Sequence, residues 1–460
     1  MEEMEITKST LCLMMRMLFT EGGKTMTTFL NNGWSLSGSD TKDFFTSCEI
    51  IDAKTSHRKI DFNDVMLHHI FKDEDGNVKS MTIDPAKKLP DALMEGDGRL
   101  ASFVEDVLPS ELVDETVKDG LAFTLKSNGN ETFFLVSPQA YSTLGQRINL
   151  PGAAMQYSSI GRECHIADHI ANHKEKQYCT AVVKQDNGVD KIFAVLSDTY
   201  KAIDLFVLKK ITESLTTTSK MGNPTCLRWY IDHYMAEIVL SFPDHGKEIC
   251  DSYGIEPMTP CVKLQSSDTG ECAVRAVGFW KTNEGDEILT DEFSRTHKGK
   301  FTAADVVEGV KKEVFDKYEV LPKKLQELSF IPVTPKTLDL SKAKNCAYNA
   351  EILKRVYMTV ITNCKVPSVL GKKRTAELEE QLTYMIDASA HYSAYAVAKD
   401  IMSLPSFLES WVYTAAPNMK SGDAVMEKLQ KAVSQAPYEP YEMITERAMK
   451  KVPTVYLVAE

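Results

Sequence analysis

Three histidines at helical spacing are the most chemically suggestive residues of this 460-residue chain. His165, His169 and His173 lie four residues apart, so a helix would place them on one face, where imidazoles can chelate a transition metal. No His-Glu-x-x-His motif accompanies them, and no obvious carboxylate supplies a third kind of ligand. We interpret the series as a solvated helical face, with a metal site as the alternative, and the sequence predicts no cofactor.

Other residue types that catalyse reactions do not form a recognised motif. The glycines make neither a dinucleotide-binding nor a phosphate-binding loop, and no nucleophile elbow is present. Acidic pairs such as Asp198 with Asp204, or Asp268 with Glu271, would suit magnesium in a nuclease, but their spacing is unspecific. The ten cysteines contain no Cys-x-x-Cys pair, which indicates reduced thiols in a cytosolic protein. We therefore expect a protein that is not an enzyme.

Positive charge is concentrated in one part of an acidic chain. Between residues 291 and 374, 17 Lys and Arg residues outnumber 10 Asp and Glu residues, a net charge of +7 in a chain of net charge −12. Such asymmetry favours a surface that faces a polyanion, with nearby aromatic residues such as Trp280 and Phe293 available to stack on unpaired bases. Ordinary solubilising surface is the alternative. The candidate nucleic-acid contacts are Lys298, Lys300, Lys311, Lys312, Lys372, Lys373 and Arg374.

Turn signals predict the sheets that must position these residues. Asp75-Gly76, Asn128-Gly129 and Asn187-Gly188 each separate two extended runs, and these dipeptides tolerate the positive φ of tight hairpin turns. We expect antiparallel hairpins that pair 66–72 with 78–83, 121–126 with 131–136, and 178–184 with 191–196. Further strands are expected at 226–232, 236–242, 258–264 and 271–282.

Capping signals predict helices between the strands. Ser137 followed by Pro138 is typical of a helix start, and Thr302 with Asp305 has the spacing of a capping box. Beyond residues 330–340 the pattern becomes helical, with candidates at 346–360, 375–388, 392–402, 405–413, 423–434 and 440–451. We therefore predict an α+β fold of antiparallel, hairpin-built sheets with interspersed helices over residues 26–335. A mostly helical C-terminal domain over residues 336–460 should follow it.

The N-terminal residues contain a signal of a different kind. Codons for Glu21-Gly22-Gly23 can form a purine-rich ribosome-binding site at a suitable distance before Met26. We expect translation to start at Met26, with residues 1–25 an untranslated leader or a disordered N-terminus, and this implies a bacterial or phage gene. A short amphipathic helix is the alternative. No uninterrupted apolar run in the chain approaches the ~18 residues of a membrane helix, so no membrane partner is expected.

Three blocks of sequence resemble the phage/plasmid-like protein family carried by prophages, plasmids and phage genomes. The blocks are 141–151, 193–204, and a third that combines 266–270 with His297-Lys298-Gly299 and the 305–314 helix. Gln265 departs from the Asn usual in the family, and a Cys-x-Asn-Gly segment is replaced around residues 281–285. The family-motif positions are Gln146, Arg147, Ser197, Asp198, Tyr200, Ser266, Gly270, His297 and Gly299.

The resemblance covers about residues 137–315 and implies a mobile-element origin. It supplies no catalytic residues, because the family has no established activity, and we interpret Ser197 and Asp198 as the cap of a following helix. We expect a cytoplasmic accessory protein of a bacterial host cell that binds nucleic acid, single-stranded DNA in the first instance, through residues 291–374. The alternatives are a protein-binding inhibitor of host defence, a metal-dependent nuclease, and a virion structural or assembly protein. The sequence leaves the oligomeric state open.

Overall fold

The computed structural model describes most of the chain between residues 29 and 457. The described residues are 29–72, 78–83, 100–105, 119–127, 130–152, 159–172, 178–186, 188–218, 221–297, 302–330, 333–335, 354, 356–385, 394–438 and 455–457. Residues 1–25 with Met26, His173, residues 298–300 and the helix predicted at 440–451 lie outside them. Within the described ranges, no helix combines the length and apolarity needed to cross a membrane.

One large sheet is built from the three predicted hairpins. Its strands are β2 (Thr55–Asp61), β3 (Val65–Lys72), β4 (Val78–Ile83), β5 (Leu100–Glu105), β6 (Asp119–Ser127), β7 (Asn130–Val136), β8 (Tyr178–Asp186) and β9 (Val189–Ser197). Strands β3 and β4, β6 and β7, and β8 and β9 pair antiparallel, so the hairpin predictions are confirmed. The strand order is β2-β8-β9-β7-β6-β3-β4-β5. Strands β7 and β9 pair in parallel, and the connection between the two hairpins carries α3 (Pro138–Arg147) and α4 (Ser159–Asn172).

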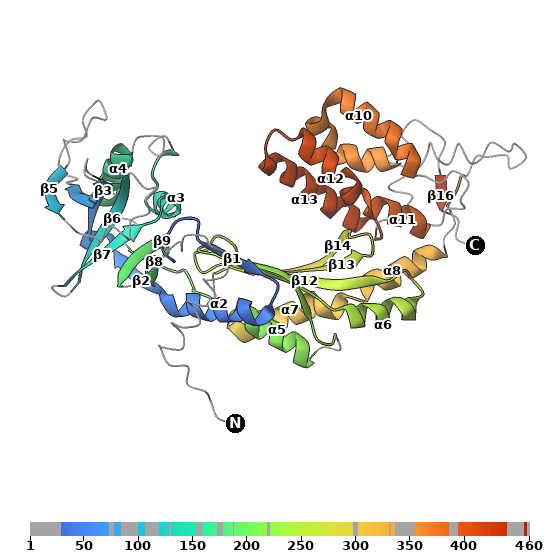
Figure 1. Cartoon of the computed structure of the whole chain (residues 1–460), viewed down its shortest axis with the longest axis horizontal. Coiled ribbons are helices and arrows are strands. Elements are labelled where there is room, and N and C mark those ends of the chain that lie inside the picture. Colours follow the sequence, from blue (N-terminus) through green and yellow to red (C-terminus); the bar gives the residue numbers. More distant parts are fainter. Residues whose placement is uncertain are drawn as a thin grey trace, which may run out of the picture.

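A second sheet has six strands, each antiparallel to its neighbour. Its order is β1 (Ser35–Gly38), β10 (Thr225–Asp232), β11 (Ala236–Ser241), β12 (Met258–Ser266), β13 (Val274–Thr282) and β14 (Glu287–Arg295). The four strands predicted in this part of the chain are confirmed as β10 to β13. Strands β1 and β14 were not predicted, and they form the two edges of the sheet. Figure 1 shows the two sheets side by side, with β1 close to the junction.

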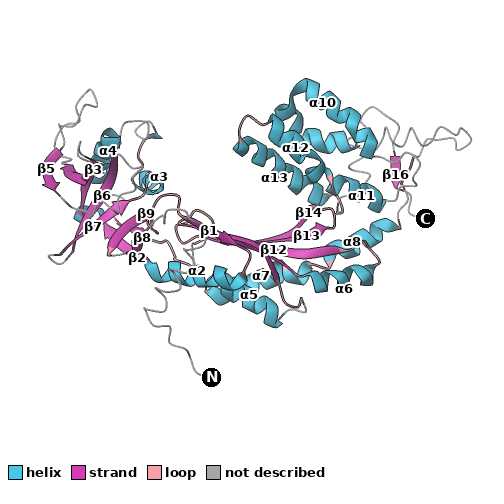
Figure 2. Ribbon diagram, in the orientation of Figure 1, coloured by secondary structure: helices cyan, strands magenta, loops and turns pink. Residues whose placement is uncertain are grey.

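Helices cover both faces of the six-stranded sheet (Figures 1 and 2). One face carries α2 (Thr41–Lys54), α5 (Val207–Thr218), α6 (Pro243–Tyr253), α7 (Ala303–Glu313) and α8 (Val320–Ser329). The other face carries α10 (Val366–Met385), α11 (Ala394–Met402), α12 (Leu404–Ala415) and α13 (Met419–Gln435). The chain is therefore α+β, with antiparallel sheets, interspersed helices and a helical C-terminal region, as the sequence predicted.

Capping contacts start the helices where the sequence placed them. The Ser137 hydroxyl accepts a hydrogen bond from Ala140 N at 3.2 Å, and Pro138 opens α3. At α7 both halves of the capping box form: Asp305 N donates to Thr302 Oγ1 at 3.3 Å, and Thr302 N donates to Asp305 Oδ2 at 2.6 Å. These bonds satisfy amides that a helix start would otherwise leave without partners. Both predicted helix starts are confirmed.

The helical region packs directly against the six-stranded sheet. Leu289 N of β14 donates to Ser434 Oγ of α13 at 2.8 Å. Buried side chains before and after the predicted boundary, among them Trp280, Val310 and Leu408, belong to one apolar cluster. Near that boundary β15 (Val333–Pro335) pairs antiparallel with β16 (Val455–Leu457) from the end of the chain. Burial of shared apolar surface therefore stabilises the sheet and the helical region together.

Gly246 tests the packing of α6 on β12. A Cβ atom at this position would lie 2.5 Å from Met258 O and 2.5 Å from Pro260 Cδ, which are parts of a strand that cannot easily move. We expect Gly246→Ala to lower the free energy of unfolding by about 1–3 kcal/mol, as overpacking does, despite the better helix propensity of Ala. Urea unfolding measures the change. The control is Lys247→Ala at the next, exposed position of α6, where a change within about 0.5 kcal/mol is expected; equal effects of the two variants would contradict this packing.

Candidate functional site

One pocket between the two sheets is lined by residues from each of the three sequence blocks described above, 141–151, 193–204, and 266–270 with 297–299. Of the motif positions, Gln146, Arg147, Ser197, Tyr200, Gly270 and His297 line it. The pocket has a volume of about 390 Å³, and we call it the inter-sheet pocket. Such a volume is within the range of small-ligand sites. The convergence of side chains from distant parts of the sequence identifies this pocket as the candidate functional site.

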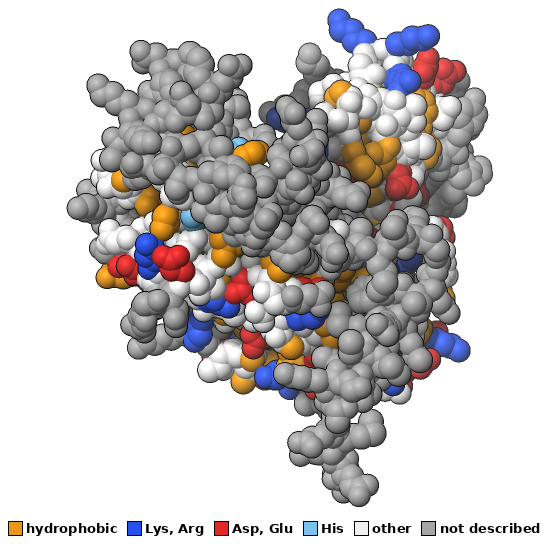
Figure 3. Space-filling model, turned by 60° about the vertical axis from the view of Figure 1, so that its left-hand side comes forward, with side chains coloured by type: hydrophobic (Ala, Val, Ile, Leu, Met, Phe, Trp, Pro, Cys, Tyr) orange, Lys and Arg blue, Asp and Glu red, His pale blue; other side chains and the backbone are white. Residues whose placement is uncertain are grey.

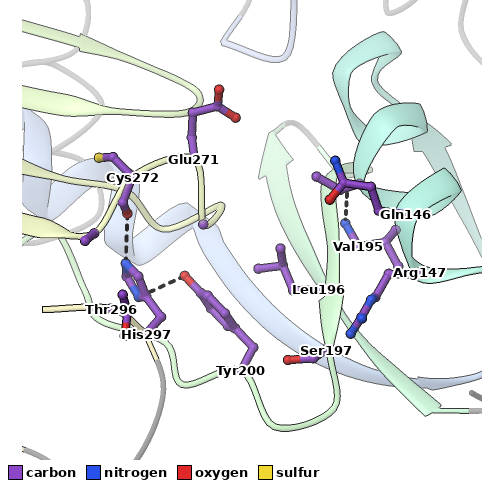
Figure 4. A pocket seen from close by; sticks show the side chains of 13 residues that line it. Gln146, Arg147, Val195, Leu196, Ser197, Tyr200, Glu271, Cys272, Thr296 and His297 are labelled. Carbon is purple, nitrogen blue, oxygen red and sulfur yellow. Dashed lines mark hydrogen bonds between the residues drawn. The ribbon is translucent and has the colours of Figure 1, made fainter.

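Two walls of different origin face each other across this pocket (Figure 4). The end of α3 presents Gln146 and Arg147 beside Ser197 at the end of β9. The opposite wall carries Glu271 and Cys272 from the connection between β12 and β13, with His297 after β14. Gln139 of α3 donates from Nε2 to Glu271 Oε2 at 3.3 Å and so links the two walls.

A tight turn at Ser267–Glu271 shapes the second wall. Ser267 Oγ accepts a hydrogen bond from Glu271 N at 3.0 Å and contacts Thr269 Oγ1 at 3.2 Å. Gly270 has a φ of +77°, and a Cβ atom there would lie 3.2 Å from a methyl group of Leu196. The left-handed backbone and the close approach both favour glycine at this point. The Ser266 side chain is fully buried beneath the turn.

A buried ion pair holds this turn against the eight-stranded sheet. Lys184 Nζ of β8 lies 2.6 Å from Asp268 Oδ2, and the two side chains are 0% and 3% exposed. Thr55 Oγ1 of β2 also donates to Asp268 Oδ2, at 3.4 Å. Burial, together with the charge of Lys184, lowers the pKa of the neighbouring His233 to about 3, so His233 is neutral. Lys184 and Asp268 therefore neutralise each other, and His233 adds no charge to the pair.

Tyr200 and His297 form the floor of the pocket next to this ion pair, and the His57 ring stacks on Tyr200. The centroid of the Tyr200 ring lies 6.1 Å from that of His57 and 5.0 Å from that of His297. His297 Nε2 lies 3.1 Å from Cys272 O, and Nδ1 lies 3.0 Å from the Tyr200 hydroxyl, which also reaches Asp268 O at 3.1 Å. Burial lowers the pKa of His297, which favours a neutral ring. Stacking and the hydroxyl contacts thus fix the position of the Tyr200 ring.

Arg147 gives the pocket its capacity to bind an anion. Its side chain is half-buried at the end of α3, and it forms no ion pair with the residues that the structure describes. A guanidinium can donate two parallel hydrogen bonds to a phosphate or carboxylate. Ser197 and Gln146 add neutral hydrogen-bonding groups on the same wall. The chemistry available here is binding, with an anionic group as the favoured ligand.

The described part of the chain does not gather the lysines and arginines of the predicted basic region into one surface. Lys311 and Lys312 lie on α7, whereas Lys372, Lys373 and Arg374 lie on α10, across the six-stranded sheet. Lys298, Gly299 and Lys300 lie outside the described residues. In Figure 3 the visible Lys and Arg side chains of the described residues are scattered among Asp and Glu side chains.

Trp280, predicted as a stacking platform, is 0% exposed and donates from Nε1 to Tyr318 O, so this prediction is wrong.

The histidine series and the acidic pairs do not form a metal centre in the described part of the chain. His165 and His169 lie on α4 and are half-buried, so they do not belong to a fully solvated face, and His173 lies outside the described residues. Asp268 is neutralised by Lys184, while Asp198 is exposed to solvent. Among the residues described, no three His, Cys, Asp or Glu side chains are grouped so as to hold a metal ion.

Ser197 and Asp198 also have a different role from the one predicted. The helix that follows them, α5, begins only at Val207, so the two residues do not cap it. Ser197 lines the inter-sheet pocket, and Asp198 contributes its main-chain carbonyl to Lys59 Nζ. Thr143, Cys272 and Thr296 line the same pocket and were not predicted, whereas Glu271, which also lines it, was named only as part of an acidic pair. No spacing signal identifies these residues, because they come from α3, from the connection between β12 and β13, and from just after the end of β14.

Comparisons with protein-family models, with curated proteins and with solved structures find no match to this chain. The candidate site therefore depends on the geometry of the pocket and on the sequence blocks that line it.

Removing one partner of the buried ion pair tests whether it joins the two sheets. Lys184→Met leaves the Asp268 carboxylate buried without a counter-charge, and we expect the free energy of unfolding to fall by about 3–5 kcal/mol. Adding Asp268→Asn to this variant removes the unpaired charge and should restore part of the loss. Urea unfolding of both variants measures these changes.

Lys431→Met is the matched control for this experiment. Lys431 pairs with Glu427 at 2.8 Å, but both side chains are more than half exposed, so a loss below about 1 kcal/mol is expected. A loss in Lys184→Met as small as that in Lys431→Met would show that the buried pair does not stabilise the junction.

Proposed function

We propose that the protein is a non-catalytic accessory protein of a mobile element that binds single-stranded nucleic acid in the inter-sheet pocket. Arg147 carries this proposal, because it lines the pocket and forms no ion pair with a described residue. A nucleic-acid phosphate is an anion that matches its planar donor group. The mobile-element origin is inferred from the sequence blocks that supply Arg147 and its neighbours.

The size of the pocket favours a single strand over a duplex. A volume of about 390 Å³ suits a ligand of small-molecule size, such as one nucleotide unit of an unpaired strand. In a duplex the bases are paired and stacked, so a nucleotide could enter only after it had been turned out of the helix at a cost of a few kcal/mol. A single strand can enter without that cost.

The chemistry of the floor favours contacts to phosphates over contacts to bases. The Tyr200 ring is half-buried and already stacks on His57 and His297, so it is less available to a base than the Arg147 guanidinium is to a phosphate. Contacts to phosphates position a strand but carry no sequence information. The proposed binding is therefore dependent on salt and tolerant of sequence, because its free energy comes largely from the release of counterions.

The lysines of the 291–374 region take a secondary part in this proposal. We call Lys372, Lys373 and Arg374 the α10 cluster. In this cluster the exposed ammonium of Lys373 lies 4.0 Å from Glu377. The six-stranded sheet separates the α10 cluster from Lys311 and Lys312. Charges on different faces can attract a polyanion over a distance, but they cannot hold one short strand together. Substituting these lysines therefore shows how much of the binding depends on charges outside the pocket.

Arg147→Gln tests the proposed function. We expect the unmodified chain to bind labelled single-stranded DNA more tightly than duplex DNA, with an affinity that falls as salt rises. The variant should lose about tenfold in affinity at low salt, because a charge-assisted pair of hydrogen bonds is lost. Fluorescence anisotropy across a salt titration measures both effects.

Two further variants make the result specific. Lys126→Gln removes one positive charge from the hairpin of β6 and β7, where Lys126 pairs with Glu131, and should change affinity less than twofold, or about 0.4 kcal/mol. Lys372→Glu with Lys373→Glu and Arg374→Glu tests the α10 cluster. Strong weakening by the triple change with no effect of Arg147→Gln would place the binding on α10, and no binding by the unmodified chain at low salt would refute the function.

A further inference from the structure

A second pocket lies beside the inter-sheet pocket and has a related chemistry. It has a volume of about 280 Å³ and is lined by residues 201–204, by α5 and by the start of α7. We call it the α5–α7 pocket. Lys201 and Lys210 contribute its positive charges, and Phe206 contributes an aromatic wall. The Lys210 ammonium lies 5.4 Å from the centre of the Phe206 ring, which keeps this charge at the pocket.

The lysines, not the end of the helix, give the α5–α7 pocket its positive charge. Thr302 and Asp305 close the capping box at the start of α7, so the Asp305 carboxylate offsets part of the positive end of the helix. Hydrogen bonds from Thr302 lower the pKa of Asp305, and the nearby charges of Arg295 and Lys201 lower it further. Arg295 and Lys201 therefore lie close to this end of α7 and add to the positive potential there.

The two pockets share a wall. Tyr200 lines the inter-sheet pocket, and the next residue, Lys201, lines the α5–α7 pocket. Lys201 N donates to His297 O at 3.1 Å, and Lys201 O lies 3.2 Å from His297 Nδ1. These contacts fix the segment that separates the two cavities. The two pockets are thus separated by one short segment of the chain.

We propose that the α5–α7 pocket is a second phosphate subsite for the same strand, so that the ligand is an oligonucleotide and not a mononucleotide. This inference rests on the proposed function of the inter-sheet pocket. Arg147 holds one phosphate, and Lys210 with Lys201 holds another further along the strand. A mononucleotide can occupy only the first subsite.

The negative charge of Asp204 in the α5–α7 pocket allows a second, independent test of the inference. Asp204 also lines this pocket, and its exposed carboxylate repels a phosphate bound there. Removing that charge should strengthen binding, whereas removing the charge of Lys210 should weaken it. A structural effect on α5 would not produce these opposite changes.

Lys210→Gln and Asp204→Asn test the second subsite with two probes, thymidine monophosphate and an oligo(dT) of about 12 nucleotides. We expect Lys210→Gln to weaken oligo(dT) binding about fivefold at low salt and to reduce the slope of log affinity against log salt by about 0.7. Asp204→Asn should tighten oligo(dT) binding. The affinity for thymidine monophosphate, measured by competition, should stay unchanged in both variants.

Lys209→Gln is the matched control, because Lys209 is adjacent on α5 and also lies near Phe206 but pairs with Glu49 at 2.9 Å. Equal effects of Lys209→Gln and Lys210→Gln, or equal affinities of the unmodified chain for the two probes, would overturn the second subsite. The proposed function would survive that outcome if Arg147→Gln still weakened binding. Loss of the Arg147 effect would remove both.

Discussion

The junction of the two sheets depends on the buried ion pair between Lys184 and Asp268. Neither charge can remain in the interior alone, so the strand that carries Lys184 and the turn that carries Asp268 must stay together. His233 adds no counter-charge beside this pair, because burial and the Lys184 ammonium keep it neutral. The position of the turn, and with it one wall of the inter-sheet pocket, follows from this constraint.

The same turn also orders the floor of the pocket. The Asp268 carbonyl lies within hydrogen-bonding distance of Tyr200 and His57, and the two ring nitrogens of His297 lie near the carbonyls of Lys201 and Cys272. Side chains that are fixed before a ligand arrives lose little conformational freedom when it binds. Because the Tyr200 ring already stacks on His57 and His297, the Arg147 guanidinium is the stronger attraction for a ligand, which favours phosphates over bases.

The elements fixed by local signals could be predicted from the sequence, and those fixed by distant partners could not. The three hairpins and the starts of α3 and α7 follow from turn and capping residues a few positions apart. Strand β1 has four residues and pairs with β10, far along the chain, so no local pattern reveals it. Lys184 ends an otherwise apolar run, as solvent-exposed residues often do, and only its tertiary partner Asp268 explains its burial.

Charge density along a sequence is a poor guide to charge density on a surface. Lys311 and Lys372 belong to one basic region of the sequence, yet their helices lie on opposite faces of a sheet. Arg147, Lys201 and Lys210 belong to separate elements, and the fold places them around two adjoining pockets. Exposed charges act together only within about 8–10 Å at physiological salt, so a strand senses those that share a pocket or its rim. Cations assembled by the fold, and not those adjacent in sequence, thus determine where a polyanion can be held.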